Sequence, residues 1–471
     1  MERAGLVRRR RPVRPVPRPG SLGQLVVAAA ERLRASIEAG DFAGLEELYA
    51  PDAVLDAALV GARRRLRGPD EIAEALASVF PGAGRLIEWD EAAHPHGVAL
   101  WLERVADDGA AVRQRHYLHL GGDGRIERQW LYTARPRTAP AADPVPEAAE
   151  ELFASLGKVA ERVTLASSGW SGNRIDRLVL ADGRALIAKR IVPGSDWLGR
   201  CTRDPGREAL LFADGVFARM PDTVDPAVVA AEPDGEAWWV VMRDVSEELL
   251  DESTPLTRDQ NRFVLARAAE MWARFWDEDV PHLSTLRDRL AFAVPAISET
   301  ERENVDILPK QFEAAWEAFG EAVDDDVGAA VLELVEDVTP LSDALAARGT
   351  TLIHGDLRDE NIAMPGGRLV LLDFGLATQG HPAAELAWYM VHDVWRIEAT
   401  HDDVVEDFRQ AVGDHDDPVA LELGLISGLV QYGWIFGHSA VVHTDPAERE
   451  WAQTELNWWV PRVRHALEQW R

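Results

Sequence analysis

The chain has 471 residues, which is too long for one ordinary domain and predicts two or three. Hydrophobic residues (46%) and charged residues (28%) occur in proportions typical of folded domains, and no apolar run reaches the roughly 20 residues that cross a bilayer. We therefore expect no membrane partner. The net charge of −30 repels phosphate backbones, so we expect no nucleic acid partner for the folded body.

The single cysteine, Cys201, excludes an intrachain disulfide and fits a reducing cytoplasm, where we expect the protein. The first twenty residues hold seven Arg and four Pro and lack the apolar segment of a secretory signal. Residues 1–21 therefore predict a disordered basic tail or residues translated from a start codon placed too early. An anchor for nucleic acid or an acidic surface is the other interpretation.

Residues 22–135 predict an α+β domain in which helices precede an antiparallel meander. Helical periodicity covers 22–40, 43–49 and 68–80, and strand-like runs joined by Gly/Asp turns follow at 98–105, 112–120 and 125–133. The phrases EAGDFAGLEELYAPDAVLD and HYLHLGGDGRIERQWLY resemble the nuclear transport factor 2-like (polyketide cyclase-like) family. This resemblance implies a cone-shaped curved sheet around a pocket. Trp101, Arg115, Tyr117 and Trp130 would line the pocket, unless they are ordinary core.

A stretch rich in Pro and Ala at 136–149 predicts a linker. Residues 150–245 then predict a strand, a Gly-rich turn, a strand, a DG hairpin, a strand, a helix near 206–215 and a strand at 236–242. Residues 246–471 are mainly helical in period, apart from the stretch LIHGDLRDENIAM and the short strand RLVLLDF.

The loop HGDLRDEN, residues 354–361, carries the clearest chemistry. It places Asp356 and Asn361 five residues apart, and Asp373 follows in LLDFG. Phosphoryl transfer needs a positioned nucleophile, metal ions on the phosphates and cations against the developing charge. Asp356 suits the carboxylate that accepts the proton, and the other two are hard oxygen donors that suit Mg²⁺. An acidic loop alone is usually a solvated turn, but the apolar segments on both sides favour catalysis.

Only three of the 50 basic residues are lysines, so a lysine inside an apolar strand is informative. Lys189 lies in ALIAKRI, where a charge needs a partner, and Glu208 on the following helix is the expected one. The pair would direct the ammonium toward nucleotide phosphates. The turn SSGWSGN includes Ser168, Gly169 and Ser171, whose backbone N–H groups would bind phosphate unless the turn is an ordinary hairpin.

The chain from about residue 150 to its C-terminus resembles the aminoglycoside phosphotransferase and choline kinase-like branch of the protein kinase-like fold, through HGDLRDEN and DFG. The resemblance implies a bilobal domain that uses Mg²⁺ and ATP, with GTP not excluded. It assigns Asp356 as the catalytic base, His354 as a brace for the loop, Asn361 and Asp373 as Mg²⁺ ligands, and Lys189, oriented by Glu208, as the phosphate-binding cation.

The segment VVMRDVS resembles the connection between the two lobes of that fold. Met242 would then contact the nucleotide, and the backbones of Arg243 and Val245 would hydrogen-bond adenine. Arg243 departs from the acidic residue common there, which leaves the selectivity for the base open.

The acceptor is expected to be a small molecule. Gly355 stands where protein kinases carry an Arg that pairs with a phosphorylated loop, and only LATQG separates Gly375 from the next helical segment. A peptide-docking segment does not fit there. The Trp-rich C-terminal helices and the acidic run THDDVVEDF are therefore the candidate walls for a cationic or sugar-like acceptor, although most of these Trp are expected in the core.

The expected fold class is multidomain α+β, with an N-terminal cone-shaped domain followed by a bilobal kinase-like phosphotransferase domain. The expected function is ATP- and Mg-dependent transfer of a phosphoryl group to a small hydroxylated molecule. The N-terminal domain would bind ligand, regulate the enzyme or form a homodimer. Two alternatives stay open, namely a non-catalytic nucleotide-binding module and an N-terminal isomerase or cyclase with an accessory kinase domain.

Overall fold

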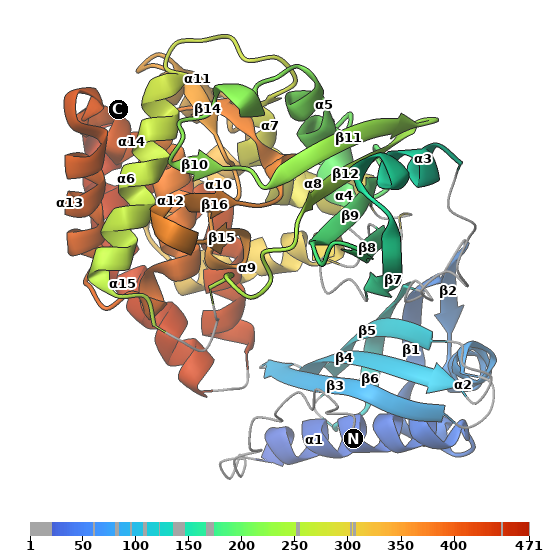
Figure 1. Cartoon of the computed structure of the whole chain (residues 1–471). Coiled ribbons are helices and arrows are strands. Elements are labelled where there is room, and N and C mark those ends of the chain that lie inside the picture. Colours follow the sequence, from blue (N-terminus) through green and yellow to red (C-terminus); the bar gives the residue numbers. More distant parts are fainter. Residues whose placement is uncertain are drawn as a thin grey trace. The chain divides into compact units, whose positions relative to one another are not determined.

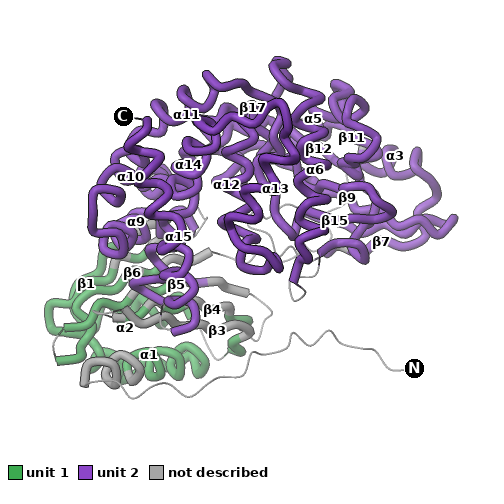
Figure 2. The backbone as a smooth tube through the Cα atoms, turned by 90° about the vertical axis from the view of Figure 1, so that its left-hand side faces the viewer, with its two compact units in different colours: residues 1–57, 64–109, 115–131 green, residues 58–63, 110–114, 132–471 purple. Residues whose placement is uncertain are grey.

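The computed structural model of the protein describes residues 21–59, 62–80, 84–94, 97–106, 111–121, 123–134, 147–165, 174–250, 255–301, 304, 308–443 and 446–470. The expected basic tail, most of the linker, and Ser168, Gly169 and Ser171 of the Gly-rich turn lie outside these residues. The chain forms two compact units (Figure 2). One comprises residues 1–57, 64–109 and 115–131, and the other comprises residues 58–63, 110–114 and 132–471.

The N-terminal unit is built around one sheet of six strands in the order β2-β1-β6-β5-β4-β3. Its strands are β1 (Tyr49–Leu59), β2 (Ala62–Arg67), β3 (Gly84–His94), β4 (Gly97–Ala106), β5 (Ala111–Leu120) and β6 (Ile126–Ala134). Helix α1 (Ser21–Ala39) contacts β3 and β4, along which it runs in Figure 1, and α2 (Pro69–Val79) packs against the turn Leu45–Leu48. Leu33 and Leu76 of these helices are fully buried, as is Leu118 of the sheet.

Three of the six strands, β1 to β3, were not expected. The two edge strands are β2, with sequence ARRRLR, and β3, which carries several acids, and charged side chains at sheet edges weaken the alternating pattern that marks a strand. The helix expected at 43–49 is instead a short 3-10 turn, because Gly44 has a φ of +77° and the chain is extended from Tyr49.

A chain of buried polar groups crosses the core of this unit. The Tyr49 hydroxyl donates to the side-chain carbonyl of Gln129, whose amide nitrogen lies 2.8 Å from Nδ1 of His116. All three side chains are almost fully buried. The side chains expected to line a pocket, Trp101, Arg115, Tyr117 and Trp130, lie outside the described part of the structure.

The second unit begins with a five-stranded antiparallel sheet, the N-lobe, in the order β11-β12-β9-β8-β7. Its strands are β7 (Val159–Leu165), β8 (Arg174–Leu180), β9 (Ala185–Ile191), β11 (Val228–Asp234) and β12 (Ala237–Arg243). Helix α3 (Glu147–Leu156) packs Phe153 against Trp239 of this sheet, so the helix belongs to the N-lobe. Helices α4 (Trp197–Cys201) and α5 (Arg207–Ala213) follow β9.

The C-lobe is helical (Figure 1), and its helices α12 and α14 pack against each other and consist mostly of buried residues. The helices are α6 (Arg258–Arg274), α7 (Leu286–Leu290), α8 (Pro295–Thr300), α9 (Phe312–Ala322), α10 (Asp326–Glu336), α11 (Thr339–Ala346), α12 (Pro382–Asp393), α13 (His401–Val412), α14 (Pro418–Gly437) and α15 (Pro446–Trp470). Fully buried Trp272, Tyr389 and Trp459 pack in one continuous core.

Short strands in this lobe carry the expected loops. They are β10 (Val224–Asp225), β13 (Ser284–Thr285), β14 (Thr351–Ile353), β15 (Ile362–Ala363), β16 (Leu369–Leu371) and β17 (Thr378–Gly380). Strands β10, β16 and β15 form one small sheet, and β13, β17 and β14 form another. The expected fold class, multidomain α+β with a strand-rich lobe followed by a helical lobe, is confirmed.

Among the residues that the structure describes, one helical stretch, Pro418–Val442, is long and apolar enough to span a membrane by length and composition. The sequence was not expected to contain such a run. Of its most apolar window, 72% is buried within the structure. Two of its buried polar side chains form hydrogen bonds within the helix, since Ser427 donates to the Gly424 carbonyl at 2.6 Å and Gln431 donates to the Ser427 carbonyl at 3.2 Å. This is the pattern of the core helix of a globular lobe.

Candidate active site

The HGD loop leaves β14 through a glycine that no other residue replaces without strain. Gly355 has a φ of +78°, and a Cβ atom at this position would lie 1.9 Å from the carbonyl oxygen of Leu376. The HGD loop and the segment after Asp373 are therefore in direct backbone contact. Sequence reasoning used Gly355 only as a missing Arg, whereas the structure gives a packing reason for it.

Glu385, in the first turn of α12, anchors the HGD loop through hydrogen bonds to its backbone. Its carboxylate accepts the backbone N–H groups of His354 at 3.0 Å and Gly355 at 2.5 Å, and the indole N–H of Trp272 at 2.9 Å. Burial raises the pKa of Glu385 to about 7, although these three hydrogen bonds favour the charged form. Sequence reasoning missed this residue. Its signal was one acid inside the otherwise apolar run AAELAWYM.

His354 is fully buried and both ring nitrogens are occupied. The Leu372 carbonyl, 3.0 Å from Nε2, can only accept, and the Asp356 N–H, 3.3 Å from Nδ1, can only donate. The ring is therefore the neutral tautomer with the proton on Nε2, in keeping with burial, which lowers the pKa of His354. In this arrangement His354 connects the HGD loop to the strand that leads to Asp373.

Asp356 has hydrogen bonds to both carboxylate oxygens. Oδ1 accepts the indole N–H of Trp388 at 3.0 Å, and Oδ2 accepts the Asn361 amide at 2.9 Å and the Arg358 Nε–H at 3.3 Å. Burial acts to raise the pKa of Asp356, but the nearby positive charges, of which Arg358 is the largest contributor, together outweigh burial and hold that pKa below its usual value. The group is thus a carboxylate at neutral pH and is able to accept a proton.

Lys189 of β9 and Glu208 of α5 meet as expected, and Asp373 of the DFG loop joins them through a contact with Lys189 that was not predicted. The Lys189 ammonium lies 2.7 Å from Oδ1 of Asp373 and 3.6 Å from Oε2 of Glu208. Burial alone disfavours the ammonium, but the two carboxylates outweigh it and raise the pKa of Lys189. Asp373 adopts a φ of +62°, an unusual conformation for a non-glycine residue, and accepts the Gly375 N–H at 3.3 Å.

Helix α5 is tied to the DFG loop by a second residue that sequence reasoning missed. Arg207 is almost fully buried, and its guanidinium donates to the carbonyls of Thr202 and His282, each at 2.9 Å, and to that of Gly375. The neighbouring residue, Glu208, is thereby held in reach of Lys189.

The oxygen atoms of Asn361 and Asp373 fit a magnesium ion. The Asn361 amide nitrogen donates to both the backbone carbonyl and Oδ2 of Asp356 at 2.9 Å, which leaves its side-chain oxygen as the atom available to a cation. The Asp373 side chain is 46% exposed. No group of three or more His, Cys, Asp or Glu in the described residues has the arrangement of a metal site, but Mg²⁺ bound to phosphates needs few protein ligands.

Two of the residues expected to contact adenine, Met242 and Val245, belong to an apolar cluster to which both lobes contribute. Met242 and Val245 are buried in it together with Ala363 of β15, and Ile187 and Leu372 pack against it while remaining partly exposed. Arg243 donates its backbone N–H to the Ala227 carbonyl at 3.0 Å, so only its carbonyl remains for a base. Its guanidinium pairs with Asp225.

Carboxylates in the acidic run at 400–408 form ion pairs with arginine side chains. The Asp407 carboxylate forms ion pairs with the guanidinium groups of Arg258 and Arg262, each at 2.9 Å. The Asp402 carboxylate pairs with Arg462 at 2.7 Å. These pairs offset the charge of Asp402 and Asp407, so fewer free carboxylates face a cationic acceptor than the sequence suggests, and the interpretation of this run as a wall stays a prediction.

The C-terminal tryptophans are mostly core, as expected. Trp388, Trp434 and Trp459 are at most 8% exposed, whereas Trp395 is 58% exposed. Of these, Trp388 contacts a predicted site residue, because its indole meets Asp356.

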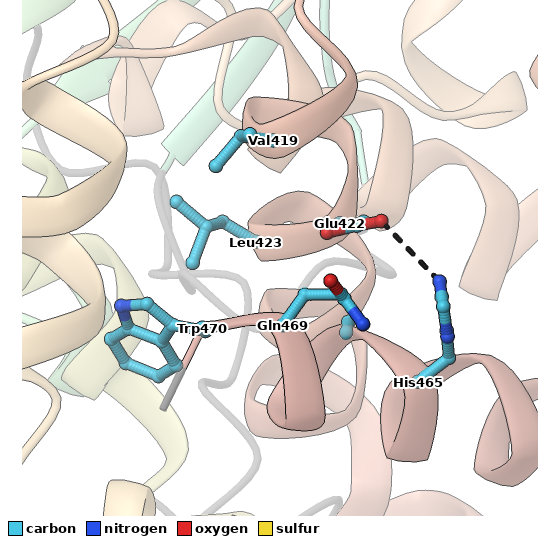
Figure 3. Close-up of a pocket in the computed structure, with 7 residues that line it drawn as sticks. Val419, Glu422, Leu423, His465, Gln469 and Trp470 are labelled. Carbon is cyan, nitrogen blue, oxygen red and sulfur yellow. Dashed lines mark ion pairs between the residues drawn. The ribbon is translucent and has the colours of Figure 1, made fainter.

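Two surface hollows of the C-lobe are lined by residues other than the predicted site residues. Figure 3 shows one of about 320 Å³ between α14 and the end of α15, where Nε2 of His465 lies 3.7 Å from Glu422. The other is lined by Trp276, Arg348 and the segment 414–418. No predicted site residue lines either hollow.

A five-stranded lobe, a helical lobe and the HGD and DFG loops between them define a kinase-like phosphotransferase fold. Residues 162–422, more than half of the chain, match the profile of the phosphotransferase enzyme family, APH. The chain belongs to this family, and the family expected from HGDLRDEN and DFG is confirmed. None of the curated proteins matches the sequence.

Solved structures match both parts of the chain at low identity. An aminoglycoside phosphotransferase from Alicyclobacillus acidocaldarius subsp. acidocaldarius DSM 446 is 15% identical, with coverage of 71% of this chain and 98% of that chain and a TM-score of 0.40. The choline kinase LicA from Streptococcus pneumoniae is 15% identical, with coverage of 68% and 96% and a TM-score of 0.40. An NTF2-like protein of unknown function from Mesorhizobium loti is 20% identical, with coverage of 25% and 96% and a TM-score of 0.21.

Proposed function

We propose that the protein transfers the γ-phosphoryl group of Mg·ATP to a hydroxyl of a small molecule. The observation that carries this proposal is the convergence of Lys189, Glu208 and Asp373, from three separate elements, on one ion-pair cluster. Asp356 and Asn361 form a second hydrogen-bonded cluster, which His354 links through Leu372 to the strand before Asp373. A buried lysine between two carboxylates is costly as mere structure, and it is suited to a polyphosphate.

The proposal gives each predicted site residue one role. The Asp356 carboxylate accepts the proton of the acceptor hydroxyl as the new P–O bond forms. Asn361 and Asp373 hold Mg²⁺, which would neutralise charge on the phosphates. Lys189, oriented by Glu208, binds the α- and β-phosphates, and His354 keeps the loop in place. Ser168, Gly169 and Ser171 bind phosphate through their backbones, and Met242, Arg243 and Val245 bind the base of ATP or GTP.

The acceptor in this proposal is aminoglycoside-, choline- or sugar-like. The segment between Gly375 and α12 supports a small acceptor, because three of its residues form β17 and pair with β13 and β14. A chain that is bound in a sheet is not free to dock a peptide. Solved structures with matching folds include enzymes titled as aminoglycoside phosphotransferases, a choline kinase and a putative fructosamine-3-kinase.

We assign the N-terminal domain, residues 22–135, to ligand binding, regulation or formation of a homodimer. We assign the linker to the expected segment 136–149, shortened to 136–146 because α3 begins at Glu147 and packs on the N-lobe. The N-lobe then extends to residue 245, and 246–471 form the C-lobe of an enzyme that we place in the cytoplasm. The buried Tyr49–Gln129–His116 chain supports a rigid, specific core in this domain rather than a loosely packed one.

A phosphate-transfer screen tests the proposal. Aminoglycosides, macrolides, amino alcohols, sugars and nucleosides are incubated with Mg·ATP, and products are read as an added phosphate by mass spectrometry. D356N and D373N are expected to lose at least about 10²-fold in kcat, while D222N, at an exposed position, retains wild-type activity. Wild-type turnover in D356N or D373N would refute the assignment.

A further inference from the structure

Trp388 lies one turn after Glu385 on α12, so both side chains reach the HGD loop from the same helix face. Glu385 binds the backbone of the loop, whereas the Trp388 indole N–H donates to Oδ1 of Asp356 at 3.0 Å. The Asn361 amide donates to the other carboxylate oxygen at 2.9 Å. Two rigid donors, one on each oxygen, fix the plane of the Asp356 carboxylate.

The indole of Trp388 is itself held by a buried cation. Arg289 of α7 is 2% exposed, and its guanidinium carbon lies 4.1 Å from the ring centroid of Trp388 and 4.6 Å from that of Phe292. Its Nε–H donates to the Gly355 carbonyl at 2.8 Å. Arg289 therefore contacts both the loop backbone and the indole that holds the carboxylate.

Burying the Arg289 guanidinium is unfavourable in free energy, which favours a functional role for this side chain. Neither terminal nitrogen of Arg289 has a hydrogen-bond partner among the described residues, which is unfavourable for a buried charge. The two aromatic faces offset part of the cost, and the carboxylates of Asp356 and Glu385 provide nearby negative charge. Burial lowers the pKa of Arg289 to about 10, so the side chain is still cationic at neutral pH.

We propose that Trp388 and Arg289 are positioning residues that fix the Asp356 carboxylate for proton abstraction. The inference rests on the proposed role of Asp356 as the base. Without the indole N–H, the carboxylate is held through Oδ2 alone, by Asn361 and Arg358, and its rotation about χ2 is less restricted. Without Arg289, the indole loses the guanidinium against which it packs. Neither residue is expected to touch the nucleotide.

Kinetics of the full-length enzyme test the proposal, with Mg·ATP as the probe and water as the acceptor. W388F keeps the ring and removes the N–H, and we expect kcat for ADP formation to fall about 10- to 100-fold while KM for ATP stays within about twofold. The matched control is W316F, because Trp316 is equally buried and its indole N–H donates to the Ala293 carbonyl at 2.7 Å. We expect W316F to stay within about twofold of wild type in both constants.

A spectroscopic readout separates positioning from general stability. In protein labelled with ¹⁵N at the indole nitrogens, W388F identifies the Trp388 signal, and D356A is expected to shift it and to speed its exchange with water. R289M is expected to broaden the same signal, whereas R462M, which removes a similar Arg–Trp contact at the surface, leaves it unchanged.

Two results would overturn the inference: a W388F kcat within about twofold of wild type, or a Trp388 signal that D356A does not move. Failure of the proposed function gives a different pattern. If D356N retained wild-type kcat, the assignment of the base would be refuted and the catalytic part of this inference with it, while the indole signal would still report the contact.

Discussion

Replacing Gly355 by alanine tests how closely the HGD loop packs on the DFG loop. At a φ of +78° a side chain costs about 1–2 kcal/mol. The new Cβ would lie 1.9 Å from the Leu376 carbonyl oxygen, so the loop must move by roughly 1.5 Å to restore an ordinary contact. Such overpacking adds about 1–3 kcal/mol, for a total loss of about 2–5 kcal/mol. Displacing the catalytic base by ~1 Å lowers the reaction rate by about 10²-fold.

The assay combines urea unfolding, followed by tryptophan fluorescence, with kcat for ADP formation. The matched control is Gly367→Ala, because Gly367 has a φ of +81° and its Cβ would meet no described atom within 4 Å. G367A carries the conformational cost alone, about 1–2 kcal/mol, and is expected to keep wild-type kcat. If G355A were no less stable and no slower than G367A, the close contact with Leu376 would be refuted.

The pKa of Glu385, about 7, lies above its ordinary value of 4.5, so the folded state binds the proton more tightly. Protonation of Glu385 therefore adds roughly 3 kcal/mol to the free energy of unfolding. This contribution is complete below about pH 4.5 and is lost as the pH rises through 7. E385Q removes this dependence, and its stability relative to wild type is expected to rise between pH 5 and pH 8 in urea unfolding; an unchanged difference would contradict this. K189M leaves the buried Glu208 without its cation and is expected to cost about 3 kcal/mol, which K189M/E208M largely recovers; equal stability of K189M and wild type would refute the pair. Chelation with EDTA is expected to stop ADP formation, and excess Mg²⁺ to restore it; full activity in EDTA would exclude the metal.

Short-range patterns made much of the second unit predictable. In β8 and β9 the alternation of apolar and polar residues and the DG turn between them fix two strands, and Leu178 and Leu180 are buried as that pattern requires. The HGD and DFG motifs are also local, so the loops that carry Asp356 and Asp373 followed from a few neighbouring letters.

Long-range partners could not be predicted in the same way. Glu385 binds the backbone of a loop 30 residues earlier, and Asp407 pairs with Arg258 across 149 residues. A single sequence gives no covariation to reveal such pairs, so the acids on α13 had the same appearance as an open anionic surface. The charged edge strands β2 and β3 were missed for a related reason, since their pairing is set by the sheet and not by their own composition.

The 2.7 Å contact between Lys189 and Asp373 has a thermodynamic consequence. If Asp373 binds Mg²⁺ as proposed, a divalent ion and the lysine ammonium would compete for one carboxylate, so the ion alone would gain little binding free energy at this position. A polyphosphate that draws the ammonium to itself would release Asp373 for the ion. The affinities for nucleotide and metal would then be linked, and each ligand would strengthen binding of the other by the same factor. The site would thus discriminate against free Mg²⁺ and take up the two together.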